Sequence, residues 1–178
     1  MSYTQVYRSS TTRALGAVTV LICAAGLVTV GMRGNERELL RFGGPLLLVL
    51  WLAWVAYWRP HVRLDESGVT MHNVFRVVHV PWARVVEIHS RYGLRVDTEQ
   101  GSYAAWAVAA PVGRDRLRGG DTEASLMTRQ RLERLRGLGE LTPGTGAPET
   151  QVRWDVPALA TTAAVAAVAL VGAARAAL

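Results

Sequence analysis

The 178-residue sequence predicts a membrane protein that combines spanning helices with one mainly-β domain. The first observation is that residues 14–32, 42–58 and 156–174 are apolar and carry no charge. Each segment is close to the ~20 residues that a helix needs to cross the hydrocarbon of a bilayer. The second observation is that apolar and polar residues alternate over much of the block between residues 59 and 155, and such alternation predicts strands.

The first two apolar segments, 14–32 and 42–58, predict a helical hairpin that follows an N-terminal segment, residues 1–13. Residues 33–41 form a short connection, so both outer ends of the hairpin must lie on one side of the membrane. That side collects slightly more arginines than the other, which predicts that it is cytoplasmic. The first group is Arg8, Arg13, Arg59, Arg63 and Arg153, and the second is Arg33, Arg37, Arg41 and Arg175.

The third apolar segment, residues 156–174, is rich in Ala and Val, and Ala favours insertion only weakly. Pro157 suits the first turn of a helix. Trp154 stands just before it, where interfacial aromatic residues occur in membrane proteins. We predict a spanning helix; the alternative is a helix packed on the first two, and small side chains would permit such packing.

The charge of the chain points to membranes more than to nucleic acids. Its formal net charge is +6, and all 20 basic residues are arginine. Because acidic residues are mixed among these arginines, the sequence does not predict a nucleic-acid-binding face. Cys23 is the single cysteine and lies within the first apolar segment, so we expect a small buried side chain and no disulfide within the chain.

From residue 59 the sequence predicts a series of short antiparallel strands. We expect Asp65 to Gly68 to form a turn in which Gly68 is free to adopt a positive φ, and Pro81 to end a strand. Trp82 and Trp106 follow strand residues and are predicted to be buried structural residues. The strands are predicted at residues 61–65, 69–73, 74–80, 82–89, 93–98 and 102–108, where 82–89 is either a strand throughout or a short turn that leads into one. Short strands separated by turns indicate a sandwich or a barrel.

The pattern then becomes helical over residues 124–138. Asp121, Thr122 and Glu123 offer capping groups, and Gly137 and Gly139 end the helix. The predicted apolar stripe is Leu126, Met127, Leu132, Leu135 and Leu138. Residues 141–155 are predicted to be a linker, loose over residues 142–148, that leads to the third apolar segment.

Several strands followed by one amphipathic helix resemble the pleckstrin-homology (PH) plan. Local residues extend this resemblance: Arg59-Pro60, Asp65-x-x-Gly68-Val69, Val80-Pro81-Trp82-x-x-Val85 and Trp106-Ala107-Val108. Over residues 14 to 138 the chain resembles the bacterial PH-domain family. It is most similar to the actinobacterial membrane-anchored group called low-molecular-weight protein antigen six-like, although the third helix departs from that group's shorter members. The resemblance implies a PH-like antiparallel β-barrel or sandwich, capped by one C-terminal helix, at residues 59–140.

The sequence carries no motif for catalysis, metal binding or a cofactor. His61, His72, His79 and His89 do not have the close spacing of metal ligands. No phosphate-binding glycine loop or nucleophile motif occurs. We therefore expect a protein that is not an enzyme, with no cofactor and no metal. The acidic turn at Asp65 also argues against a phosphoinositide pocket at the first hairpin.

Arginines near the end of the block are the candidates for contact with anionic lipid or with a protein partner. They are Arg114, Arg116, Arg118, Arg129, Arg131, Arg134 and Arg136. Each would gain ~1 kcal/mol near an anionic surface. The simpler interpretation, which we weigh more heavily, is a solvated loop and helix face.

The sequence as a whole predicts a membrane-anchored PH-like module that recruits or organises a protein partner at the inner face of the plasma membrane. One alternative is a small structural subunit of a larger membrane complex. Another is a domain that binds anionic lipid weakly.

Overall fold

The computed structural model describes residues 4–33, 35–90, 93–108, 123–139, 141 and 148–177. The chain divides into two compact units. The first, the β unit, comprises Met1–Ser9 and Pro60–Trp154. The second, the helical unit, comprises Ser10–Arg59 and Asp155–Leu178. The chain therefore passes between the units at three places.

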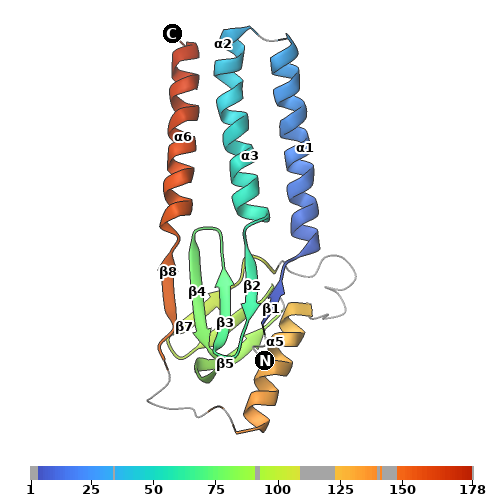
Figure 1. Ribbon diagram of the computed structural model, residues 1–178, viewed down its shortest axis with the longest axis vertical. Coiled ribbons are helices and arrows are strands. Elements are labelled where there is room, and N and C mark those ends of the chain that lie inside the picture. The colour runs from blue at the N-terminus through green and yellow to red at the C-terminus, as the bar shows by residue number, and fades with distance from the viewer. Residues whose placement is uncertain are drawn as a thin grey trace. The chain divides into compact units, whose positions relative to one another are not determined.

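The helical unit consists of α1 (Ser10–Arg33), α2 (Glu36–Glu38), a π-helical turn η1 (Leu39–Gly43), α3 (Gly44–Tyr57) and α6 (Val156–Ala177). Figure 1 shows α3 lying between α1 and α6, and α3 contacts both. Three helices are long and apolar enough to cross a membrane: Thr12–Met32, Glu36–Tyr57 and Val156–Arg175. The second begins earlier than predicted because Asn35 caps it, its side chain accepting a hydrogen bond from the Glu38 N–H at 3.0 Å.

Small residues allow the helices of this unit to approach closely. A Cβ on Gly44 would lie 2.9 Å from the Cα of Ala169, and a Cβ on Gly16 would lie 2.7 Å from the Cβ of Tyr57. The Trp51 Nε1–H also donates to Thr162 Oγ1 at 3.1 Å, joining α3 to α6. The third apolar segment is therefore a helix packed on α3, as the alternative prediction required. It is also long and apolar enough to span a membrane, as the first prediction required.

Asp155 holds the start of α6 in two ways. Its Oδ1 accepts a hydrogen bond from the Ala158 N–H at 3.2 Å, which makes it the N-cap of the helix. Its other carboxylate oxygen forms an ion pair with Arg59, the residue just before the β unit resumes. The ends of α3 and α6 are thereby linked to each other by side chains.

The β unit contains a five-stranded and a three-stranded antiparallel sheet. The larger has the order β1-β2-β3-β4-β8 and the smaller the order β5-β6-β7. Six strands lie where the sequence predicts them: β2 (His61–Leu64), β3 (Gly68–His72), β4 (Arg76–Pro81), β5 (Val85–His89), β6 (Arg95–Thr98) and β7 (Gly101–Ala104). The mainly-β character of the block is thus confirmed.

Two strands were not predicted. Strand β1 (Gln5–Tyr7) lies in the N-terminal segment and pairs with β2, and β8 (Gln151–Trp154) lies in the predicted linker and pairs with β4. Residues 141–155 are therefore not a simple linker. Both strands are at sheet edges, and they depend on partners far away in the sequence.

One core cluster joins residues of both sheets. In the larger sheet, alternate residues of β2, β3 and β4 form two cross-strand rows that are at most 1% exposed. One row is Val62, Met71 and Val78, and the other is Leu64, Val69 and Val80. Trp82 is 2% exposed, as predicted, and its Nε1–H donates to the carbonyl of Asp65 at 2.8 Å. The indole therefore fills the core and also holds the β2–β3 turn.

The prediction for Trp106 is wrong, because this side chain is 57% exposed. Strand β7 ends at Ala104, earlier than the alternation suggested, so Trp106 lies in the turn that follows. Its backbone N–H donates to Asn73 Oδ1 at 2.7 Å, while Asn73 Nδ2 donates to the carbonyl of Ala104 at 3.0 Å. Asn73 thus connects the β3–β4 turn of the larger sheet to the end of the smaller one.

The reason given for Gly68 is also wrong. Among the described residues, the glycines with positive φ are Gly93, Gly101 and Gly139. Gly68 is needed for space instead, since a Cβ there would lie 2.2 Å from the carbonyl oxygen of Val80 on the paired strand.

Helix α5 (Glu123–Gly137) forms as predicted but buries a different face. Its buried residues are Ala124, Ser125, Thr128, Leu132 and Leu135. Leu126, Met127 and Leu138 are 43%, 37% and 61% exposed, so the predicted stripe is wrong at these positions. At 100° per residue they project away from the Thr128–Leu132–Leu135 face. The predicted capping residues Asp121 and Thr122 and the loose segment 142–147 lie outside the described residues.

Candidate interaction surfaces

The β2–β3 turn is saturated by its own hydrogen bonds. Asp65 Oδ1 accepts from the Ser67 N–H at 3.0 Å, from Ser67 Oγ at 2.5 Å and from the Gly68 N–H at 3.1 Å. Burial raises the pKa of Asp65, but the hydrogen bonds from Ser67 and Gly68 and the nearby charge of His79 outweigh it, so the pKa is lowered overall. The turn therefore presents a carboxylate, and the N–H groups of Ser67 and Gly68 are already used. It offers no cradle for a phosphate.

Two of the predicted arginines are bound to strand β5. Arg129 Nη2 donates to the carbonyl of Ile88 at 3.2 Å, and Arg136 Nη2 donates to the carbonyls of Val85 and Val86 at 3.0 and 3.1 Å. Strand β5 is an edge strand of the smaller sheet, and these guanidinium groups bind carbonyls along it. Their partners are distant in sequence, so no local pattern could have predicted this role.

The other candidate arginines are divided. Arg134 is exposed, whereas Arg131 is partly buried. Arg114, Arg116 and Arg118 lie outside the described residues. Within the described part of the chain, the arginines of α5 do not form one basic face, and their proposed contact with lipid or partner stays a prediction.

The outward side of α5 is an exposed surface of mixed character, which we call the outer α5 face. It consists of Leu126, Met127, Gln130, Glu133 and Arg134. At 100° per residue these five lie within about a third of the helix circumference, opposite the buried residues. Exposed apolar side chains beside a single cation suit contact with a protein surface better than contact with a phosphate.

The larger sheet carries a pair of stacked histidines, and the smaller sheet carries one histidine beside two carboxylates. His61 and His72 face each other on β2 and β3, with ring centroids 4.2 Å apart and planes 10° from parallel. His89 Nε2 lies 2.9 Å from Asp97 Oδ2 and 3.7 Å from Glu87 Oε2. A hydrogen bond from Ser102 lowers the pKa of Asp97; burial opposes the shift, and His89 and Arg95 reinforce it. No group of three or more metal-ligating side chains occurs in the part of the chain that the structure describes.

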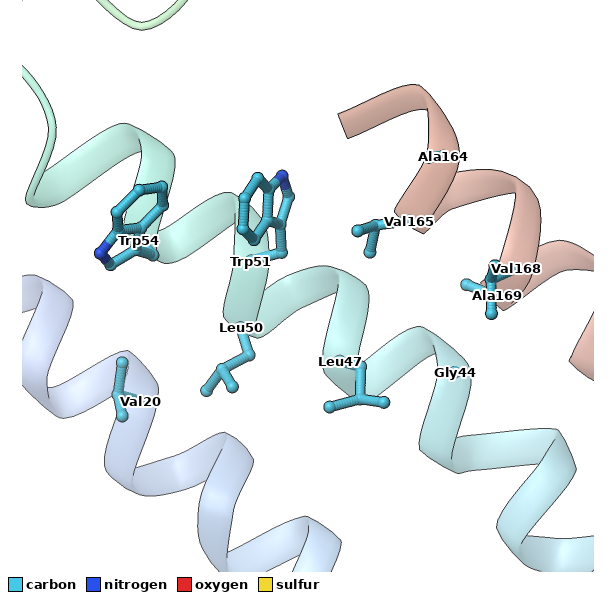
Figure 2. A pocket seen from close by; sticks show the side chains of 10 residues that line it. All are labelled: Val20, Gly44, Leu47, Leu50, Trp51, Trp54, Ala164, Val165, Val168 and Ala169. Carbon is cyan, nitrogen blue, oxygen red and sulfur yellow. The ribbon is translucent and has the colours of Figure 1, made fainter. Parts of the chain in front are cut away.

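The helical unit carries an apolar groove of about 680 Å³. Figure 2 shows Leu47, Leu50 and Trp51 of α3 lining it together with side chains of α6. The full lining is Val20, Gly44, Leu47, Leu50, Trp51, Trp54, Ala164, Val165, Val168 and Ala169. Because the Trp51 N–H is already bonded to Thr162, the groove has an apolar lining suited to lipid tails or to another apolar helix.

Two antiparallel sheets that share a core, with a helix across the β5 edge, place the block in the class of small mainly-β modules flanked by candidate membrane helices. Residues 59–141 match the model of a family described as bacterial PH domain. PH domains are in general non-catalytic modules that bind lipids or proteins. No curated protein and no solved structure matches the chain. The narrower resemblance to the actinobacterial antigen-six-like group stays a prediction.

Proposed function

We propose that this protein is a membrane-anchored, non-enzymatic PH-type module that recruits or organises a protein partner at the inner face of the plasma membrane. The observation that carries the proposal is the way in which the family-matched block connects to the apolar helices. Strand β1 leads into α1, α3 leads into β2, and β8 leads into α6. A PH-type unit is thereby joined at three points to helices that are long and apolar enough to span a bilayer.

The β2–β3 turn favours a protein partner over a phosphoinositide headgroup. Asp65 lies in this turn and is ionised at neutral pH, since its pKa is lowered. An inositol phosphate at this turn would be repelled by that carboxylate, and it would find the N–H groups of Ser67 and Gly68 already bonded. The outer α5 face supplies the better surface, because Leu126 and Met127 are exposed there. The flexible side chain of methionine adapts readily to a partner's surface.

A small structural subunit is the alternative, and the groove of the helical unit favours it. Val168 lines this groove and is 73% exposed, so the side chain is available to a second membrane protein. In that case the helices would bind the partner, and the β unit would only accompany them.

Site-specific photo-crosslinking of the full-length chain in native membranes separates the two functions. A photoreactive amino acid would replace Met127 on the outer α5 face, Val168 in the groove, or Glu66 in the acidic turn as a control. We expect a protein adduct from position 127 and none from position 66. Leu126→Glu, combined with the probe at 127, should remove the adduct, because a carboxylate would have to be buried in the contact.

Adducts from position 168 alone would favour the structural subunit. The absence of protein adducts from all three positions would contradict recruitment by either surface. Equal adducts from positions 127 and 66 would indicate random collision and would also count against the outer α5 face.

A further inference from the structure

All three connections between the units leave the five-stranded sheet at the same end of its strands. Tyr7 at the end of β1 is paired with Val62, and His61 is the first residue of β2. His72 is paired with His61, so β3 ends and β4 begins at this end as well. Trp154 at the end of β8 is paired with Arg76, the first residue of β4. We call this end of the strands, where the chain leaves the β unit, the connection edge.

The connections are very short. One residue, Asp155, separates β8 from α6, two residues separate β1 from α1, and three separate α3 from β2. Since each residue extends the chain by at most about 3.6 Å, Trp154 and Val156 lie no more than about 7 Å apart. The candidate span begins at Val156 itself. The headgroup layer on each side of a bilayer is also about 5–7 Å thick.

The connection edge exposes two tryptophans. Trp154 is 66% exposed and Trp106 is 57% exposed. The two hydrogen bonds of Asn73 hold the Trp106 turn at this edge, because Asn73 lies in the β3–β4 turn. Two large aromatic side chains are thus exposed at one edge of the unit. Such side chains are enriched at the level of the headgroups in membrane proteins.

The connection edge is also basic, whereas the opposite edge contains acidic turns. Arg76 and Arg153 are exposed near the ends of β4 and β8. In the smaller sheet, Glu87 and Asp97 are paired with each other partway along their strands, and the carboxylates of both lie within 3.7 Å of His89 Nε2. At the opposite edge, the β2–β3 turn contains Asp65 and Glu66, and the β6–β7 turn contains Glu99. Asp65 lies within 3.8 Å of Arg63, and Glu99 lies within 3.8 Å of Arg84.

We infer that the connection edge of the β unit is seated in the headgroup layer of an anionic bilayer, with Trp106 and Trp154 at the interface and Arg76 and Arg153 near lipid phosphates. This inference rests on the membrane anchoring proposed above and adds a second contact to it. The attraction of exposed arginines to an anionic surface adds to the interfacial preference of the two tryptophans.

The test uses the full-length chain in vesicles that contain phosphatidylglycerol. In a Cys23→Ala background, a single cysteine at Ala104, beside Trp106, or at Glu66, at the opposite edge, would carry an environment-sensitive fluorophore. We expect lipid with a spin label on its headgroup to quench the fluorophore at 104 several-fold more than the one at 66. Iodide in the aqueous phase should show the reverse order.

Two variants test the residues themselves. Trp106→Ala should reduce lipid quenching at position 104. Arg76→Glu with Arg153→Glu should reduce it in anionic vesicles more than in neutral ones, because only the anionic surface attracts the arginines. If lipid quenches the fluorophore at position 104 as strongly in the double glutamate variant as in the parent, Arg76 and Arg153 do not contact the lipid phosphates.

Alkaline carbonate extraction of the same vesicles separates membrane anchoring by the helices from contact of the connection edge with the headgroups. A chain that is released contradicts membrane anchoring and, with it, this inference. A chain that is retained, but whose fluorophore at 104 is quenched only by iodide, leaves the anchoring intact and overturns the seated edge.

Discussion

Trp82 links the core to the β2–β3 turn, and two substitutions separate these contributions. Trp82→Ala removes a fully packed side chain, so we expect a loss of about 3–5 kcal/mol from the free energy of unfolding of the β unit. Trp82→Phe keeps most of the ring but loses the hydrogen bond to the Asp65 carbonyl, for a loss of about 1 kcal/mol from that bond. Hydrogen exchange at β2 and β3 amides of the detergent-solubilised full chain measures both. Unchanged protection in Trp82→Ala would contradict its place in the core.

Asp65 gives the β unit a dependence on acid. Its folded pKa is lowered from the ordinary value of 3.8, so the ionised group contributes stability above that pH. This contribution is lost as the pH falls through the folded pKa. Asp65→Asn keeps an acceptor for Ser67 and Gly68 but has no charge to titrate. We therefore expect the parent to lose more stability than the variant between about pH 5 and pH 2.

Chemical unfolding at several pH values measures this difference. The carboxylate of Asp97, whose pKa is also lowered, titrates in both proteins and cancels in the comparison. Parallel pH profiles for the parent and Asp65→Asn would show that the Asp65 charge contributes nothing.

Gly68 and Gly137 provide a matched pair of glycine substitutions. Gly68→Ala would place a Cβ 2.2 Å from the carbonyl oxygen of Val80, so β3 and β4 must separate locally. We expect a loss of about 3 kcal/mol, at the upper end of the usual cost of overpacking. Gly137→Ala in α5 meets no atom within 4 Å and should be neutral or stabilising by up to about 1 kcal/mol. Thermal unfolding that ranks the two variants in the opposite order would contradict this packing.

At the scale of single residues, the sequence predicts features that depend on local neighbours better than features that depend on contacts with distant residues. The burial of Trp82 was predicted because this residue follows strand residues, and the structure confirms it. Trp106 has a similar local sequence and is exposed, because its position depends on hydrogen bonds with Asn73, which is 33 residues away. Gly68 was expected in a turn on local grounds, but its reason for being glycine is the carbonyl of Val80 across the sheet.

Helix α5 is attached to the edge of β5 through two arginines. Arg129→Ala and Arg136→Ala each remove hydrogen bonds to β5 carbonyls. Each variant should therefore lose about 1 kcal/mol from the free energy of unfolding of the β unit. This loss is smaller than that for a buried charged hydrogen bond, because Arg136 is exposed and Arg129 only partly buried. Arg134→Ala is the control, since Arg134 lies on the outer α5 face, and it should change stability by less than about 0.5 kcal/mol. Faster hydrogen exchange along β5 in the first two variants alone checks the assignment. Equal effects of all three would show that only charge or helix propensity matters.

Elements with a strong local pattern were predictable, and elements made by distant pairing were not. The patterns over residues 61–65 and 69–73 predict β2 and β3, and the apolar segments predict α1, α3 and α6. Strand β1 is three residues long and strand β8 four, too short for a periodic signal, and they exist because β2 and β4 offer edges to them. The arginine-rich sequence of α5 similarly suggested a ligand surface, while two of its arginines bind β5.

For the whole molecule, the pairing of β1 with β2 constrains how the chain crosses a membrane. Val6 is paired with Arg63, so residues before α1 and residues after α3 belong to one sheet. Strand β8, just before α6, belongs to the same sheet. If α1 and α3 span the bilayer, they must do so as a hairpin that returns the chain to its starting side. Arginine counting at the helix ends, which separates the two sides only narrowly, is therefore needed for orientation and not for the hairpin itself.

This constraint leads to a labelling pattern across the membrane of intact cells. In a Cys23→Ala background, single cysteines at Val6, Glu66 and Gln151 lie in the β unit, and Met32, which is 81% exposed, lies at the far end of α1. If the β unit is cytoplasmic, an impermeant maleimide should label position 32 in intact cells and the other three only after permeabilisation. The reverse pattern would keep the three spans and invert the orientation. Labelling of positions 6 and 66 from opposite sides is incompatible with the β1–β2 pairing, because strands of one sheet cannot be separated by a bilayer.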